Sequence, residues 1–323
     1  MPVDWTTLRQ HATRQSDLLT RRQCLAAGMT DDALQWRVSS GRWARLRVGV
    51  FLTRPGRDDW HVTATADLLR CLSGAPAADA AFCGRSALYL WGLERKPPVV
   101  TEVVVPYERA IASGPTLMVR RSVRWEDLVD ETAYPWRTTL PATLLDVAAR
   151  GSAIDALSAV ARAVQKEVVS VGELRGELAR RQGHRHSRVL GPALADVEEG
   201  AQSGAEVLYV RDVERAHGLP STTRQALSDV GRRRLHDNEY AGYGLVVEVD
   251  GRLGHEQWQD RVKDGRRDRQ LLSTARATTR VFWADVAVTP CDTAVDIGAV
   301  LRARGWPGRP RRCRRAGCAV PPG

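Results

Sequence analysis

The spacing of apolar residues divides the first 60 residues into two short helices and a hairpin. Helical spacing runs through RRQCLAAG and stops at Gly28, a residue suited to a left-handed helix end. Thr30 is a capping residue for a second helix, which has Leu34 and Val38 on its apolar face. The run RWARLRVGVFLT then alternates as strands do, around a break at Gly49. Two helices, a tight turn and a hairpin predict a winged helix-turn-helix.

The outward-facing polar residues of this unit form the first candidate site, an interface with DNA. Side chains on the second helix would meet base edges, and arginines of the hairpin would meet phosphates. The candidates are Gln35 and Arg37 on the helix and Arg42, Arg45 and Arg47 on the hairpin. The alternative is an ordinary small α+β unit whose arginines line a solvated strand.

Residues 61–190 predict a mixed α/β domain without a catalytic pattern. Helical runs are DWHVTATADLLRCL, AFCGRSALYLWGL, LPATLLDVAARG and IDALSAVARAVQ, and strand-like runs are TEVVVPYE and TLMVRRS. His184 and His186 resemble a metal pair, but no third ligand lies near them in the sequence. We therefore expect both histidines to be solvated loop residues.

The rest of the chain predicts a further domain and a tail. A helix, two strands, a helix and a strand indicate a small mixed sheet covered by helices. Seven arginines and no acids lie between Arg302 and Arg315, so the tail is expected to be disordered and to attract phosphates. Cys313 and Cys318 in the tail have no partner ligands nearby, which argues against a metal site. The chain is expected to be an α+β multidomain protein with four parts, 1–60, 61–190, 200–306 and 307–323.

Charge and hydropathy narrow the class of partner. Lys and Arg number 48 against 38 Asp and Glu, a net charge of +10, which favours a polyanion. DNA is the first expectation, and RNA is the weaker alternative. The sequence has neither a long apolar run nor an apolar signal core, so we expect a cytoplasmic protein without a membrane partner. No small-molecule substrate is expected.

Carboxylates near the end of an apolar strand form the second candidate site. Glu248 and Asp250 lie on one face of the strand GLVVEVDG, and Asp237 precedes them on the other arm of a hairpin. A hard cation such as Mg²⁺ or Mn²⁺ takes such ligands, and Asp237, Glu248 and the Val249 carbonyl would bind it. A carboxylate inside an apolar strand needs a cation or a donor, so an arginine is the alternative partner of Glu248.

The segment from about 200 to 306 resembles the DUF559 family, part of the PD-(D/E)XK nuclease-like group related to very-short-patch repair endonucleases. The matching elements are S203-x-x-E206, Asp237, VEVDGRLGH, D264-x-x-R-D268-R269 and RVFWADV. The resemblance implies a restriction-endonuclease-like mixed sheet with a catalytic set of Glu206, Asp237, Glu248, Asp250 and His255. Arg266 and Arg269 would clamp phosphates. Glu206 equally fits a capping box with Ser203, and the arginines equally fit surface pairs with Asp264 and Asp268.

The segment up to about residue 180, including RWARLRVGVFL and TTLPATLLDVAAR, resembles proteins that carry the winged-helix domain of AbiEi-type antitoxins. Two hypotheses follow. The first is a DNA-binding, Mg²⁺-dependent endodeoxyribonuclease. The alternative is a non-enzymatic regulator, similar to a type IV antitoxin, with a degenerate nuclease fold and a toxin or defence-system partner. The E-x-D motif lacks the usual lysine and Asn238 follows Asp237, and both departures favour the regulator.

Overall fold

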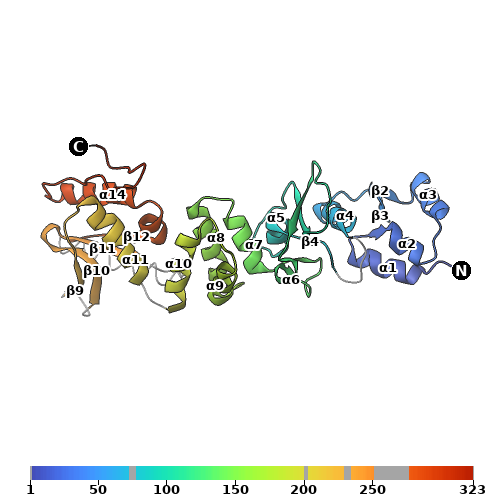
Figure 1. The fold of residues 1–323 in the computed structure, drawn as a ribbon, viewed down its shortest axis with the longest axis horizontal. Helices are drawn as coiled ribbons and strands as arrows, with labels where there is room; N and C mark the ends of the chain where they lie inside the picture. Colours follow the sequence, from blue (N-terminus) through green and yellow to red (C-terminus); the bar gives the residue numbers. More distant parts are fainter. Residues whose placement is uncertain (1, 73–77, 200–202, 229–233, 251–275, 323) are drawn as a thin grey trace. The chain divides into compact units, whose positions relative to one another are not determined.

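The computed structural model describes residues 2–72, 78–199, 203–228, 234–250 and 276–322. The chain divides into two compact units, Met1–Val147 and Ala148–Gly323, which are described separately (Figure 1). Among the helices of the described ranges, none combines the length and the apolar character needed to cross a membrane.

The first unit opens with the predicted winged helix. Its elements are α1 (Trp5–Arg14), β1 (Leu18–Thr20), α2 (Arg21–Ala26), α3 (Asp31–Ser39), β2 (Ala44–Arg47) and β3 (Val50–Leu52). The two helices and the hairpin are as predicted, whereas α1 and β1 were missed. The strands form a sheet in the order β1-β3-β2, and Leu8, Cys24, Leu34 and Phe51 pack in the core.

Local capping explains where these helices begin. Thr20 and Gln23 form a capping box at the start of α2. The Thr30 hydroxyl accepts a hydrogen bond from the Ala33 amide at 3.2 Å and begins α3 as predicted. Gly28 lies after α2 at φ +87°, a left-handed conformation that costs glycine little.

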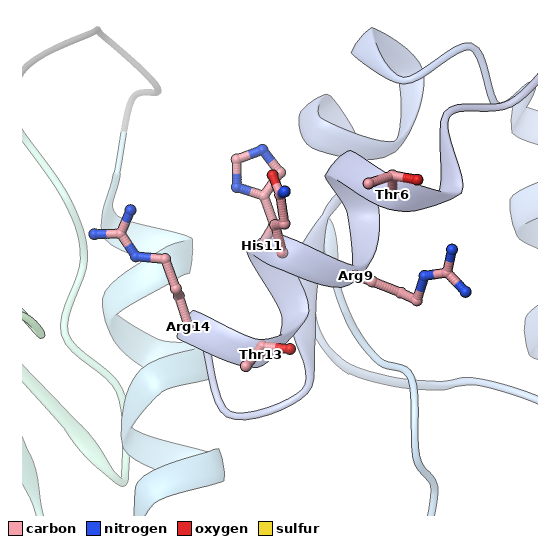
Figure 2. A pocket seen from close by; sticks show the side chains of 6 residues that line it. Thr6, Arg9, His11, Thr13 and Arg14 are labelled. Atoms are coloured by element: carbon pink, nitrogen blue, oxygen red, sulfur yellow. The ribbon is translucent and has the colours of Figure 1, made fainter.

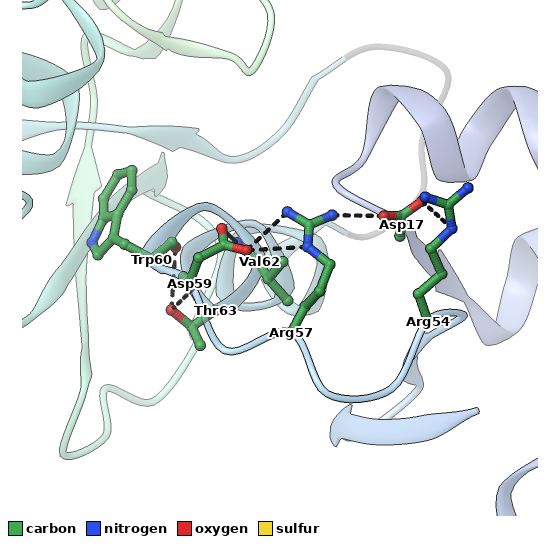
Figure 3. A network of polar contacts seen from close by, with 7 residues as sticks. All are labelled: Asp17, Arg54, Arg57, Asp59, Trp60, Val62 and Thr63. Atoms are coloured by element: carbon green, nitrogen blue, oxygen red, sulfur yellow. Dashed lines mark hydrogen bonds and ion pairs between the residues drawn. The ribbon is translucent and has the colours of Figure 1, made fainter. Parts of the chain in front are cut away.

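An ion-pair network joins the winged helix to the next helix, α4 (Trp60–Cys71) (Figure 3). The Arg57 guanidinium contacts Asp17 at 2.6 Å and Asp59 at 2.8 Å. Asp59 also caps α4 by accepting from the Val62 amide at 3.2 Å. One arginine therefore links the turn after α1 to the start of α4.

The remainder of the first unit is a five-stranded sheet in the order β6-β5-β4-β8-β7. The strands are β4 (Ala81–Phe82), β5 (Thr101–Pro106), β6 (Leu117–Ser122), β7 (Val129–Asp130) and β8 (Arg137–Thr138). The helices are α5 (Gly84–Leu90), α6 (Trp125–Leu128) and α7 (Leu140–Ala148). The predicted helix over AFCGRSALYLWGL begins only at Gly84, because Ala81 and Phe82 pair with β5 as a strand.

The second unit joins a helical part to a mixed sheet. The helices before the sheet are α8 (Ala153–Gln165), α9 (Val171–Ala179), α10 (Ser187–Glu199), α11 (Ser203–Leu208) and η1 (Tyr209–Arg215). The strands are β9 (Thr223–Ser228), β10 (Arg234–Tyr240), β11 (Leu245–Asp250) and β12 (Ala277–Phe282), followed by α13 (Trp283–Ala287) and α14 (Pro290–Ala303). The sheet order is β12-β11-β10-β9; β11 and β12 run parallel and the other pairs antiparallel.

Two expectations about the second unit are wrong. His184 and His186 are buried, and the His186 Nε2 lies 3.0 Å from the carbonyl oxygen of Gly151, which lies just before α8. The tail, expected to be disordered, packs against the unit instead. The Arg311 amide donates to the His217 carbonyl at 2.8 Å, and Val320 is buried beside Cys318. Apolar contacts offset the ordering cost that the arginine-rich composition suggested.

Candidate nucleic-acid interface and carboxylate site

The outer face of α3 carries exposed polar and aromatic side chains. Gln35 and Ser39 are exposed as predicted. Between them along the helix, Trp36 is 51% exposed, which is unusual for so large an apolar side chain. Exposed aromatic surface on a helix is typical of a binding face. Trp36 was not among the predicted residues, although its position two residues after the buried Leu34 places it outside the apolar stripe.

Arg37 was predicted to face outward from α3, but its side chain packs against two tryptophan rings. Its guanidinium lies 4.4 Å from the ring centroid of Trp5 and 5.1 Å from that of Trp43. The residue is half-buried, and this burial, with the nearby charge of Arg42, lowers the pKa of the guanidinium. Cation–π contacts of this kind hold α3 to α1 and to the hairpin. Arg37 is thus placed to support the fold rather than to reach a base edge.

Arg42, in the turn before β2, and Arg45, on β2, lie on the exposed side. The Arg42 guanidinium stacks 4.6 Å from the Trp36 ring, and that of Arg45 lies 5.7 Å from the Phe51 ring. Both arginines are exposed. Val48 at the hairpin tip is 87% exposed. We call Gln35, Trp36, Ser39, Arg42 and Arg45 the α3–wing surface.

Arg47 is held inside the first unit. Its guanidinium forms a bidentate ion pair with Asp67 of α4, at 2.6 Å from Nε and 3.2 Å from Nη2. Asp67 is only 1% exposed. The hydrogen bonds to Asp67 raise the pKa of the Arg47 guanidinium. The third predicted phosphate contact therefore joins the hairpin to α4.

A second basic surface lies along α1. A hollow of about 610 Å³ there is lined by Thr6, Arg9, Gln10, His11, Thr13 and Arg14 (Figure 2). Figure 2 shows Arg9 and Arg14 projecting from opposite sides of the helix. None of the described side chains that line it is a carboxylate, so the hollow suits an anion. The signal that was missed is the i, i+4 spacing of the buried Leu8 and Ala12, which predicts α1.

In the carboxylate site, Glu248 is 7% exposed on β11. The Arg280 Nε on the adjacent strand β12 donates to the Glu248 Oε2 at 3.2 Å. Val249 is buried beside it. An arginine is thus the partner observed for Glu248, the alternative left open by the sequence. A divalent cation bound at Glu248 would therefore lie close to the positive charge of Arg280.

The other predicted members of the set lie largely outside the described residues. This applies to the side chains of Asp237 and Asp250 and to the whole of His255, Arg266 and Arg269. On the backbone, Asn238 of β10 pairs with Val247 of β11, which places both strands side by side as predicted. Glu206 is half-buried in α11.

Further buried polar groups of the second unit also have protein partners. Glu239 lies 3.4 Å from the Arg276 guanidinium, and Glu214 accepts from the Thr222 hydroxyl at 2.7 Å. The hydroxyls of Tyr209 and Tyr240 lie 2.9 Å apart, and burial raises the pKa of both. Buried polar groups need such partners. The contacts of Tyr209 and Glu214 join η1 to the sheet and to the segment before β9.

Comparison with known proteins gives two kinds of match. The chain is 30% identical over 171 residues to the adenine phosphoribosyltransferases of Xanthomonas axonopodis pv. citri (strain 306) and Xanthomonas oryzae pv. oryzae (strain PXO99A). The aligned part is 52% of this chain and 80% of those enzymes, which makes them relatives over about half of its residues. Residues 7–53 match the transcriptional regulator, AbiEi antitoxin, and residues 80–195 match the AbiEi antitoxin C-terminal domain. The resemblance stated from the N-terminal sequence is confirmed, and these two segments are AbiEi antitoxin domains.

Proposed function

We propose that the chain is an antitoxin-like transcriptional regulator that binds DNA through the α3–wing surface. The observation that supports this most strongly is the contact between Arg42 and the exposed Trp36. It extends the outer face of α3 onto the turn that leads into β2, and helix and hairpin are the two elements that a winged helix presents to DNA. No contact among the described residues favours phosphoribosyl transfer to adenine, the activity in the name of the Xanthomonas relatives.

The side chains of this surface suit different parts of a duplex. The Gln35 amide has the donor and acceptor that match adenine in the major groove. Arg42 and Arg45 are exposed cations for phosphates on either side of that groove. Arg9 and Arg14 of the α1 hollow supply two more. We further propose a toxin as the partner, cytoplasm as the location, and the promoter of the protein's own operon as the DNA site.

Binding of this promoter is expected to weaken steeply with salt. About four phosphate contacts release about as many counterions, so affinity should fall about a hundredfold between about 50 and 200 mM salt. Titration of a fluorescent promoter duplex with the full chain at a series of salt concentrations measures this slope. A scrambled duplex of equal length is the control. Equal affinity for both duplexes would contradict a sequence-specific regulator.

A Mg²⁺-dependent endonuclease is the competing proposal for residues 200–306. It requires Asp237, Glu248 and the Val249 carbonyl at the metal, with Glu206, Asp250 and His255 near the phosphate. The ion pair of Glu248 with Arg280 weighs against it. The regulator therefore accounts better for this domain, with the sheet as a scaffold.

We accordingly expect purified protein to leave supercoiled plasmid intact in Mg²⁺ or Mn²⁺. The assay is the conversion of supercoiled to nicked plasmid over time, with the Glu248→Ala variant in parallel. Equal background rates are expected, since Glu248 already has a cationic partner. Nicking by the wild type that disappears in Glu248→Ala would establish the nuclease instead.

A further inference from the structure

Four potential metal ligands from separate parts of the second unit converge. They are His217 just after η1, Cys291 in the first turn of α14, and Cys313 and Cys318 in the C-terminal segment. The imidazole nitrogen and the three sulfurs all lie within 4.8 Å of one another. Their type suits zinc, which is bound in structural sites by thiolates and imidazole.

The distances suit one tetrahedral ion. The Cys291 and Cys313 sulfurs lie 3.6 Å apart, and the Cys318 sulfur lies 3.7 Å from the His217 Nε2. With zinc–sulfur bonds of about 2.3 Å, the edge of a tetrahedron is about 3.8 Å. A disulfide bond would need the two sulfurs at about 2.05 Å, much closer than they are.

Hydrogen bonding prepares the histidine for this role. His217 is fully buried, and its Nδ1 lies 3.1 Å from the Val213 carbonyl oxygen, one turn back along the helix. Since a carbonyl only accepts, Nδ1 must carry the proton. The lone pair of a neutral imidazole then lies on Nε2, the atom that faces Cys318. A backbone carbonyl on the far nitrogen is a common support for a histidine ligand.

The surroundings of the sulfurs favour thiolates and a closed site. Cys291 follows Pro290 at the start of α14, where the helix dipole stabilises negative charge. The Arg315 amide donates to the Cys313 sulfur at 3.4 Å. Cys291 and Cys318 are buried, and Val320 packs against them. Four protein ligands in a buried cluster leave no open position for a substrate, as in a structural site.

We propose that His217, Cys291, Cys313 and Cys318 bind one zinc ion, which fixes the C-terminal segment to η1 and α14. Three thiolates and Zn²⁺ carry one net negative charge, and Arg312 and Arg314 beside Cys313 in the sequence offset it. The ion adds to the apolar contacts of Cys318 and Val320 in ordering this arginine-rich segment. It also leaves the DNA-binding surface untouched, since that surface lies in the first unit.

The test is the zinc content of the full chain, purified under reducing conditions and dialysed against a chelator, measured by mass spectrometry of the metal. About one zinc per chain is expected. Chains produced with cobalt should show the thiolate-to-cobalt absorption and the intense visible bands of a tetrahedral site. This spectrum tests the wild type directly and does not depend on how any variant folds.

Variants that each remove one of the four ligands test where the zinc ion binds. Cys318→Ser and His217→Gln should each lower the zinc affinity at least about tenfold relative to the wild type, measured by competition with the chelator. Cys24→Ala is the matched control, since it removes a buried thiol of the first unit and should keep the full zinc content. A wild type without zinc or cobalt, a Cys291–Cys313 disulfide, or Cys318→Ser with unchanged zinc would each overturn the proposal.

Discussion

Replacing Arg47 by alanine is expected to lower the free energy of unfolding of the first unit by about 3 kcal/mol. The reason is Asp67, which is 1% exposed on α4 and accepts two hydrogen bonds from this guanidinium. Without Arg47, a carboxylate would remain in an apolar surrounding with its ion-pair partner removed. Urea unfolding of the full chain, followed by circular dichroism, measures the change.

Arg45→Ala is the matched control for this variant. Arg45 lies on the same strand but is exposed, so its loss should change stability by less than about 0.5 kcal/mol. A double variant, Arg47→Met with Asp67→Leu, should recover most of the stability, because it removes both charges together. If Arg47→Ala unfolds like Arg45→Ala and instead abolishes DNA binding, Arg47 contacts DNA and the role assigned to its ion pair is wrong.

These two arginines show where prediction from the sequence succeeds and where it ends. The hairpin was predictable because its alternation and its turn at Gly49 are local signals. Regular alternation also places Arg45 and Arg47 on one face. The strand pairing shifts between them, and the irregularity turns Arg47 toward Asp67. A single extra residue in a short strand has no clear signature in one sequence.

Long-range contacts account for the other differences. The sequence places acids on β10 and β11 correctly, yet Glu248 pairs with Arg280, 32 residues further along the chain. Cys318 likewise lies against His217, 101 residues before it. Local spacing predicts helices, caps and strands, whereas only the packing of distant segments decides which charged or ligating groups meet. The tail was misjudged for this reason, since its composition is that of a disordered segment but its partners lie on η1 and α14.

Removing both exposed arginines of the α3–wing surface is expected to weaken promoter binding about a hundredfold at low salt while leaving the fold intact. Among the residues that the structure describes, no buried carboxylate holds Arg42 or Arg45 as Asp67 holds Arg47, and each is expected to neutralise one phosphate. The double alanine variant should therefore reduce the salt slope by about two counterions. Fluorescence titrations at several salt concentrations measure both quantities.

The control must remove the same charge elsewhere in the first unit. Arg70→Ala with Lys96→Ala does so at two exposed positions that are not part of the α3–wing surface, and should leave affinity and slope nearly unchanged. Gln35→Ala separates base recognition from phosphate contact: it should cost about 1–3 kcal/mol on the promoter but little on a scrambled duplex, with an unchanged slope. If the control pair weakens binding as much as the Arg42 and Arg45 pair, attraction is set by overall charge. A defined DNA-binding surface should make the two double variants differ. If they do not differ, the contact of Arg42 with Trp36 has no part in DNA recognition.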